Sequence, residues 1–302
     1  MGRGNCMSNE LRPVNFDSIL GQENVVDRLR ISINSAKVRG EALSHCLLDG
    51  APGLGKTTIS TAIANELGVG IQIANGGNIR SVKNLMPYLM KMEENMVFFI
   101  DEIHRLPVSV EEFLYPCMED FRMDVGSDNE LSMELPKFTM IGATTEAGNL
   151  SRPFFDRFTF KYQLKLYGQD VLSKIVSASA GKLNMKIMPN AATNISMRSR
   201  GTPRIANGIV QWCRDYALDK GSQTLSNTIV DEACVLSGIS KNGSTEQDRT
   251  YMKALKKFGR PAGLKTLVDL TNIDKDTIQY VIEPFLMRQG LIKRTPRGRV
   301  LS

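Results

Sequence analysis

The segment GAPGLGKT, residues 50–57, constrains the fold of this chain more than any other feature. Its glycines and its final Lys-Thr pair fit the pattern G-x-x-x-x-G-K-[ST], in which backbone N–H groups curl around phosphate oxygens. The short apolar stretch HCLLDG leads into it, and the helix-like stretch TTISTAIANELG continues it to Gly68. Because a strand and a helix on its two sides make a merely glycine-rich loop improbable, the segment predicts a phosphate-binding loop in an α/β fold.

A second apolar strand ends in two acids. The run MVFFIDE, residues 96–102, is typical of a buried parallel strand, and Asp101 and Glu102 follow its apolar part. We expect Lys56 to reach the β- and γ-phosphates and Thr57 and Asp101 to hold Mg²⁺. Glu102 can then polarise a water for in-line attack on the γ-phosphate. Alone, two such acids would suggest an exposed helix start, but the phosphate loop upstream favours the nucleotide interpretation.

Three other segments carry weaker candidates when taken alone. A third strand, FTMIGATT, ends in Thr144 and Thr145, and a hydroxyl there can contact the γ-phosphate or the attacking water. Arg157, in SRPFFDRF, is either part of an ordinary surface ion pair or a finger that reaches a neighbouring subunit's γ-phosphate. Arg204 follows Pro203 in RGTPRIAN, which by itself indicates only a helix start.

The pattern changes along the chain. Strand signals fade from about Tyr167, and four helical stretches follow up to about residue 238. The segment 237–249 is polar and rich in Gly and Ser, which predicts a linker, and short helices and a β-like basic end complete the chain. We therefore expect three domains, at residues 1–166, 167–237 and 238–302.

Composition and charge limit the classes of function that this chain can have. The N-terminus has no apolar core and no run is long enough to span a membrane, so we expect a cytoplasmic protein without membrane contact. Five cysteines without a CxxC pair suggest reduced thiols, and two histidines make a His-based zinc site improbable. Residues 238–302 hold 13 Lys/Arg against 6 Asp/Glu, whereas residues 1–237 hold 25 against 26. This asymmetry suggests a polyanionic partner, with a solvated basic tail as the alternative.

Taken in order, these segments resemble the RuvB family, AAA+ motors that branch-migrate Holliday junctions. The match runs from about residue 11 to the C-terminus, and its most specific parts are DEIHRL, RSRGTPRIAN and RTPRGR. The resemblance implies an α/β P-loop AAA+ ATPase domain, followed by an all-α lid domain and a C-terminal winged-helix domain. It further implies ATP and Mg²⁺ as cofactors, a homo-hexamer with ATP sites between subunits, and double-stranded DNA at a Holliday junction as the partner.

The resemblance also assigns roles to individual residues. Thr145 would be the first sensor, Arg157 the finger acting in trans, and Arg204 the second sensor, on the lid. The implied nucleotide contacts are Leu11, Arg12, Gly53, Gly55, Lys56, Thr57, Thr58, Glu119, Asp120, Phe121, Tyr167 and Arg204, of which Glu119, Asp120 and Phe121 would act across the subunit boundary.

The C-terminal segment fits a winged helix on physical grounds as well. Its helical part places Ile278, Val281, Ile282, Phe285 and Leu286 at helical spacing, which predicts one buried face. The stretch LIKRTPRGRV then carries four cations with no acid between them: Lys293, Arg294, Arg297 and Arg299. The resemblance makes Arg294 and Arg299 DNA contacts, and arginines on a ribbon suit phosphate oxygens rather than base readout.

Three departures from the family pattern stand out. The hairpin in segment 121–138 has the short polar turn GSDNE, without the apolar tip that docks onto RuvA, so a RuvA-like partner is implied but its usual contact is missing. Glu146 and Phe155 stand where the family usually has Arg. From these departures we expect a compact, divergent version of the family, from a phage or a reduced genome.

Two other functions use the same domains. An ATP-gated DNA-binding switch or loader would bind DNA without processive translocation, but the presence of Glu102 and Arg157 argues for rapid turnover. A defective relative could insert into a host's ring through its altered hairpin and poison it. We expect the first function, an ATP-driven translocase on four-way junctions.

Overall fold

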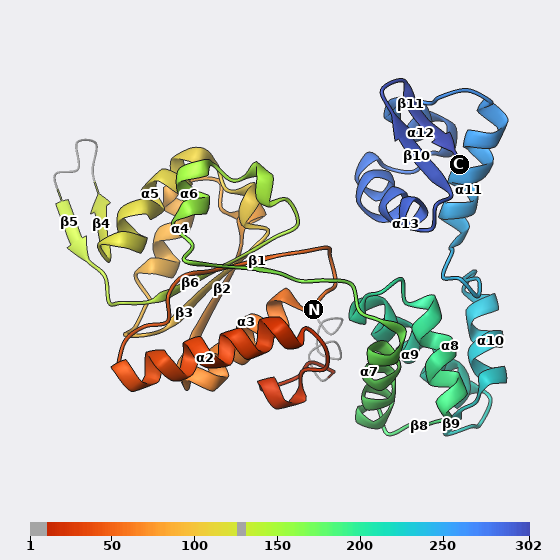
Figure 1. Ribbon diagram of the computed structural model, residues 1–302, viewed down its shortest axis with the longest axis horizontal. Helices are drawn as coiled ribbons and strands as arrows, with labels where there is room; N and C mark the ends of the chain where they lie inside the picture. Colours follow the sequence, from red (N-terminus) through yellow and green to blue (C-terminus); the bar gives the residue numbers. More distant parts are fainter. Residues whose placement is uncertain (1–10, 126–130) are drawn as a thin grey trace. The chain divides into compact units, whose positions relative to one another are not determined.

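The computed structural model describes residues 11–125 and 131–302, which form two compact units (Figure 1). The first unit extends to Val171 and includes Thr202–Arg204, and the second contains Leu172–Gly201 and Ile205–Ser302. Within the described ranges, no helix is both long enough and apolar enough to cross a lipid bilayer.

The first unit is built on a five-stranded sheet in which every neighbouring pair is parallel. The strands, in spatial order, are β2 (Ile71–Asn75), β3 (Val97–Asp101), β6 (Thr139–Thr144), β1 (Cys46–Asp49) and β7 (Phe160–Gln163). Because β3, β6 and β1 are neighbours and parallel, the loops that follow them leave the sheet at the same edge, where ligands bind in open α/β sheets.

Helices cover both faces of this sheet (Figure 1). On one face lie α2 (Glu23–Arg39) and α3 (Lys56–Leu67), and on the other lie α4 (Val82–Leu89), α5 (Val108–Glu119) and α6 (Arg152–Asp156). Short 3-10 turns connect these elements: η1 (Phe16–Ser18), η2 (Gly76–Asn78), η3 (Ile103–Arg105) and η4 (Ala147–Asn149). Successive strand residues alternate between the two cores, since Phe99 packs with the α2–α3 side and Phe98 with the α4–α5 side. The predicted α/β domain is confirmed.

A two-stranded antiparallel hairpin leaves the first unit beyond α5. Its strands are β4 (Arg122–Val125) and β5 (Leu131–Glu134), which extend away from the sheet (Figure 1). The turn GSDNE, whose polarity and shortness we singled out, lies outside the described residues.

The segment after the sheet folds as four helices, as predicted. They are α7 (Gln169–Lys182), α8 (Pro189–Arg198), α9 (Pro203–Asp219) and α10 (Asn227–Leu236). Two short parallel strands, β8 (Lys186–Ile187) and β9 (Thr224–Leu225), join their ends and were not predicted, because two residues carry no periodicity.

The C-terminal domain has the expected order of helices followed by a ribbon. Its elements are α11 (Glu246–Phe258), α12 (Leu264–Thr271), η5 (Thr277–Ile282), α13 (Glu283–Arg288), β10 (Ile292–Thr295) and β11 (Gly298–Leu301). Tyr251, Leu267, Ile278 and Phe285 meet in one core, and β10 and β11 pair as an antiparallel ribbon. This arrangement confirms the predicted winged helix.

One residue of the predicted buried face is misplaced. Val281 is 51% exposed, whereas Ile278 and Ile282 are 0% and 1% exposed. The reason is that η5 is π-helical, with the N–H of Glu283 donating to the carbonyl of Ile278. A π-helical turn takes more residues than an α-helical turn, so a spacing of four returns to the core and a spacing of three does not. Pro284, which has no N–H to donate, follows directly and suits this irregular turn.

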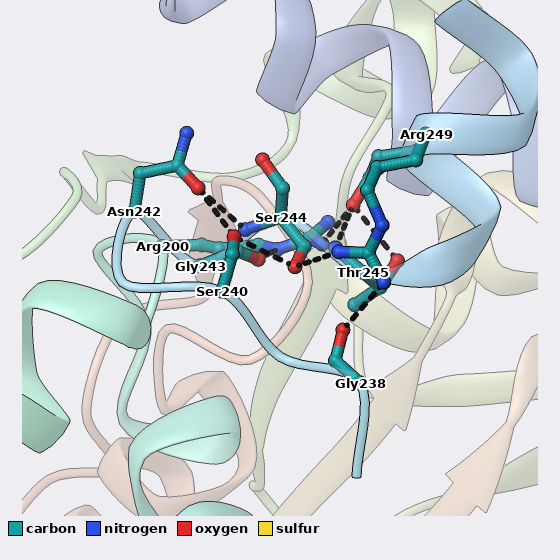
Figure 2. A network of polar contacts seen from close by, with 9 residues as sticks. Arg200, Gly238, Ser240, Asn242, Gly243, Ser244, Thr245 and Arg249 are labelled. Atoms are coloured by element: carbon teal, nitrogen blue, oxygen red, sulfur yellow. Dashed lines mark hydrogen bonds and ion pairs between the residues drawn. The ribbon is translucent and has the colours of Figure 1, made fainter. Parts of the chain in front are cut away.

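The polar segment predicted as a linker is partly helix and partly a bonded loop (Figure 2). Helix α11 already begins at Glu246, and the loop before it is closed by Gly243 N–H donating to Ser240 O at 2.9 Å. Arg200, which precedes α9, donates from Nε to Gly243 O at 2.9 Å and forms an ion pair with Asp248. Its guanidinium also lies 4.1 Å from the ring centre of Phe285. The lid and the winged helix are therefore joined by a buried arginine as well as by the chain.

Replacing Asp248 by alanine is expected to lower the free energy of unfolding of the second unit by about 3–5 kcal/mol, because it leaves the Arg200 charge buried and unpaired. The Asp248 and Arg200 side chains are 0% and 7% exposed. The fluorescence of Trp212, the single tryptophan, reports unfolding of this unit in urea.

Asp215→Ala is the control for that measurement. Its ion pair with Arg214 has an aspartate side chain that is 56% exposed, so a loss of about 0–1 kcal/mol is expected. Equal losses for the two variants would contradict the structural role given to Asp248.

Candidate functional site

The phosphate loop connects β1, an inner strand of the sheet, to the N-terminus of α3. Gly53 and Gly55 have φ of +81° and +97°, which side chains rarely adopt, so the loop needs glycine at these positions. A Cβ on Gly53 would also stand 2.9 Å from Cβ of Arg204, and the Arg204 N–H donates to Gly53 O at 3.4 Å. Thr57 and Thr58 lie half-buried in the first turn of α3.

The amino group of Lys56 lies beneath this loop. It donates to the carbonyl oxygens of Gly50 at 2.6 Å and Ala51 at 3.1 Å, and the residue is 8% exposed. Burial lowers the pKa of Lys56, while the carboxylates of Asp101 and Asp49 oppose that change. The acids at the ends of β3 and β1 therefore favour the charged form of the lysine.

The two acids at the end of β3, Asp101 and Glu102, have different surroundings. Asp101 ends β3, and its carboxylate accepts the N–H of Glu102 at 3.0 Å. Glu102 has φ of +51°, and its side chain, 41% exposed, lies 3.1 Å from Nη1 of Arg105. A left-handed residue at this point turns the Glu102 carboxylate away from the strand direction and toward solvent.

Sequence reasoning missed the residue that makes room for this turn. A Cβ on Gly76, which follows β2, would overlap the carbonyl oxygen of Glu102. Strands β2 and β3 pair with Asn75 opposite Asp101, so Gly76 lies beside the acid pair. The Gly-Gly pair after Asn75 was the available signal, but only the strand order shows what it faces.

The end of β6 presents two threonines with different surroundings. Thr144 is 1% exposed, and its hydroxyl contacts Nδ1 of His104 at 3.0 Å and accepts the N–H of Glu146 at 2.9 Å. Thr145 is half-buried at the same edge. Since Thr144 serves the local fold, Thr145 is the better placed of the two for a ligand.

The segment around Tyr167 contacts Gln22, before α2, and Leu54, in the phosphate loop. The Tyr167 hydroxyl donates to Leu54 O at 3.1 Å, and burial raises its pKa. Gln22 binds the backbone of Lys165 twice, through Nε2 to O at 2.6 Å and through Oε1 to N–H at 3.1 Å. Leu11 is buried and Arg12 is exposed. Gln22 was not assigned a role by sequence reasoning, because its partner is 143 residues away.

Arg157 forms a second cluster at the end of α6. Its guanidinium lies 3.9 Å from the ring centre of Tyr115, donates to Pro153 O at 2.8 Å and pairs with Glu119 at 3.2 Å. Within the described part of the chain, its buried Nε has no hydrogen-bond partner. The structure thus brings together two predicted site residues, Arg157 and Glu119.

The two residues after Glu119 are directed differently. Asp120 is exposed and lies 3.4 Å from Arg122. Phe121 packs its ring against His45 and Phe138, with centroid distances of 6.2 and 5.8 Å. The ring of Phe121 therefore belongs to the core of its own unit.

Two of the family departures have local partners. The carboxylate of Glu146 accepts a hydrogen bond from the side chain of Asn149 in η4. The ring of Phe155 lies 4.7 Å from Nζ of Lys161 and 5.7 Å from the guanidinium of Arg152. Neither contact explains the loss of an arginine.

The basic ribbon carries its four cations on β10, β11 and their turn. Lys293 and Arg297 are exposed, and Arg294 lies directly opposite Arg299 across the ribbon. Both of the paired arginines bind Glu283, a partner that sequence reasoning did not identify.

Comparison with known protein families covers almost the whole chain. The model for the Holliday junction DNA helicase RuvB P-loop domain matches residues 11–164, the RuvB AAA lid model matches residues 167–240, and the RuvB C-terminal winged helix model matches residues 241–302.

Individual relatives agree over similar lengths. The Holliday junction branch migration complex subunit RuvB of Rhodopirellula baltica is 43% identical over 299 residues, which cover 97% of this chain and 82% of that protein. Its counterpart in Myxococcus xanthus is 42% identical, with 97% and 87% covered. The solved structure of the Thermotoga maritima RuvB Holliday junction branch migration motor has 37% identity and a TM-score of 0.88, with 97% of this chain and 96% of that chain covered. This chain therefore belongs to the RuvB family.

Proposed function

We propose that this protein is an ATP hydrolase that translocates on double-stranded DNA and drives branch migration of Holliday junctions in recombination and repair. The observation that carries the proposal is that Lys56, Asp101 and Glu102 follow the ends of β1 and β3 at the same edge of one parallel sheet, in a chain that also carries a basic ribbon. Membership of the RuvB family supports the same function, as do the names of the relatives given above. The three domains are assigned to residues 1–166, 167–237 and 238–302.

ATP is assigned to the phosphate loop, with Lys56 at the β- and γ-phosphates. Gly53, Gly55 and Thr58 would offer backbone N–H groups. Leu11 and Arg12 would lie near the nucleotide, Tyr167 would line the adenine pocket, and Arg204 would be the second sensor. Thr145, half-buried beside the engaged Thr144, would be the first sensor.

The residues present fit Mg²⁺, for which Thr57 and Asp101 are the proposed ligands. In the described ranges no group of three or more His, Cys, Asp or Glu side chains could hold a metal, so an all-protein site is not available there. Mg²⁺ at nucleotide sites keeps water and phosphate oxygens as ligands and needs only one or two from protein. When bound, it would neutralise charge on the β- and γ-phosphates.

Hydrolysis would be completed between subunits of a homo-hexamer. Arg157 is proposed as the finger acting on the neighbouring subunit's γ-phosphate, and Glu119, Asp120 and Phe121 as part of the same boundary. The ion pair between Arg157 and Glu119 supports a shared location for these roles. The ring would act in the cytoplasm of a bacterium, or of a phage host.

The DNA contacts are assigned to Arg294 and Arg299, with Lys293 and Arg297 beside them. A ribbon of this charge suits backbone phosphates, which a motor must grip at any sequence. A RuvA-like partner is part of the proposal, but the turn GSDNE offers no apolar anchor, which argues against binding through the usual contact.

The test is a branch-migration assay on a synthetic four-way junction, with and without a RuvA protein. We expect ATP-dependent displacement of the arms and ATPase activity stimulated by DNA, both lost in Lys56→Ala. Junction binding without displacement in either condition would favour an ATP-gated switch or loader instead. Displacement only when RuvA is added would show that the short hairpin still permits that partnership.

A further inference from the structure

A buried carboxylate lies between the two opposed arginines of the ribbon. Glu283, at the start of α13, has a side chain that is 0% exposed. Its carboxylate accepts from Nε and Nη2 of Arg294 at 2.8 and 2.7 Å, and from Nε of Arg299 at 2.9 Å. The hydroxyl of Tyr251, on α11, donates to the same carboxylate at 2.9 Å. Four elements of the winged helix thus meet at one acid.

Three side chains donate hydrogen bonds to this buried carboxylate. A carboxylate taken fully out of water is costly unless several donors satisfy it, and three side chains do so here. Burial, followed by the negative charge of Glu283, raises the pKa of Tyr251 well above its usual range, so its hydroxyl stays a donor. Two arginines and one carboxylate leave this group with one net positive charge.

The acid offsets repulsion between two like charges on the ribbon. Arg294 and Arg299 are direct cross-strand neighbours, and like charges in such positions repel each other. Backbone bonds fix the other side of Arg299, since its N–H donates to Ala262 O at 2.8 Å and its carbonyl accepts from Ala262 N–H at 3.0 Å. In contrast, within the described ranges no acidic side chain lies within ion-pair distance of Lys293 or Arg297.

The hydrogen bonds leave one edge of Arg294 for a ligand. Glu283 takes the Nε–Nη2 edge, and the Arg294 side chain is 43% exposed. A guanidinium has five donors in a planar fork, so the Nη1 end of Arg294 can still bind a phosphate oxygen. The Arg299 side chain is 18% exposed and is more deeply held.

We propose that Glu283 is a positioning residue for DNA: it locks Arg294 and Arg299 side by side so that the exposed end of Arg294 meets a backbone phosphate without a search among rotamers. The proposal rests on the proposed function, in which the ribbon binds duplex DNA. It goes further because it assigns part of the DNA affinity to an acid that does not itself contact DNA. Preorganised arginine loses less side-chain entropy on binding, which strengthens the contact.

The positioning role and a purely electrostatic role of Glu283 predict opposite changes in DNA affinity when Glu283 is replaced. If Glu283 only subtracts one charge from a basic surface, Glu283→Gln should bind DNA more tightly and with a steeper salt dependence. If it positions the arginines, the same change should weaken binding on the order of tenfold, the effect of losing one or two charged hydrogen bonds. Glu283→Asp keeps the charge but moves the carboxylate, so positioning predicts weaker binding and the purely electrostatic role predicts no change.

The experiment measures binding of the full-length protein to a fluorescent four-way junction by anisotropy, at several salt concentrations. Asp269→Asn is the matched charge control, because it removes an exposed acid from the same domain and leaves the arginines alone. We expect weaker binding and a shallower salt dependence for Glu283→Gln and Glu283→Asp, and unchanged or tighter binding for Asp269→Asn. Tyr251→Phe removes a single hydrogen bond to Glu283 and should give a smaller loss, measurable even if the Glu283 variants fold poorly.

Arg294→Ala separates the failure of this inference from that of the proposed function. If Arg294→Ala binds the junction as well as the parent, the DNA role of the ribbon is wrong. If Arg294→Ala weakens binding while folded Glu283→Gln, Glu283→Asp and Tyr251→Phe match or exceed the parent, the ribbon binds DNA and only the positioning role is overturned.

Discussion

Arg157→Ala is expected to lower kcat for ATP hydrolysis by about 10³–10⁵-fold, the range over which arginine fingers act in other nucleotide hydrolases. Arg157 is held by Glu119, by the Pro153 carbonyl and by the ring of Tyr115, so its guanidinium occupies a fixed place at the end of α6. Nucleotide binding should persist, because Lys56 and its loop are unchanged. Steady-state ATPase assays with DNA present measure the effect.

Mixing subunits tests whether Arg157 acts in trans. Rings of Arg157→Ala alone and of Lys56→Ala alone should both be inactive, and rings containing both should recover hydrolysis, because a Lys56→Ala subunit still offers Arg157 to its neighbour. Arg152→Ala is the control, since Arg152 lies on the same helix, is 81% exposed and pairs only with Asp156 in the described ion pairs. Failure of mixed rings to recover would place the action of Arg157 within its own subunit.

Glu102→Gln is expected to lower kcat by about 10²–10⁴-fold, the usual contribution of a general base. The substitution keeps the size of the side chain and should leave ATP affinity nearly unchanged, so the protein would accumulate with ATP bound. Turnover and the binding of a fluorescent ATP analogue, measured on the same preparation, separate the two effects.

Glu112→Gln provides the comparison for Glu102→Gln. Glu112 is an exposed acid on α5, and its loss should leave turnover within a few-fold of the parent. Full activity of Glu102→Gln would show that another group polarises the water.

The parts of the site that the sequence predicted are those encoded in one short segment. The phosphate loop, the acids after β3 and the helix ending at Gly68 each combine local chemistry with a local period. The winged helix was predictable for the same reason, apart from Val281, because nothing in the spacing of apolar residues distinguishes a π-helical turn from an α-helical one.

The parts that could not be predicted depend on partners far apart in the chain. Gly76 has a role only because β2 pairs with β3, and Arg200 only because the loop at Gly243 packs against it. In the sequence, Glu283 is only an acid that precedes Pro284, and its arginine partner becomes visible only in the folded structure. Periodicity indicates which face of an element is buried, but it does not say which side chain from another element will lie there.

The bonded loop between the lid and the winged helix has a consequence for domain exchange. A chimera that takes its C-terminal domain from another RuvB protein would keep Arg200 but could lose Asp248, the Gly243 carbonyl and the ring of Phe285. The donor domain would then meet a buried guanidinium that it was not selected to accommodate. A workable junction for such hybrids therefore lies before Arg200, so that this arginine and its partners come from one parent, rather than in the polar segment that the sequence suggests.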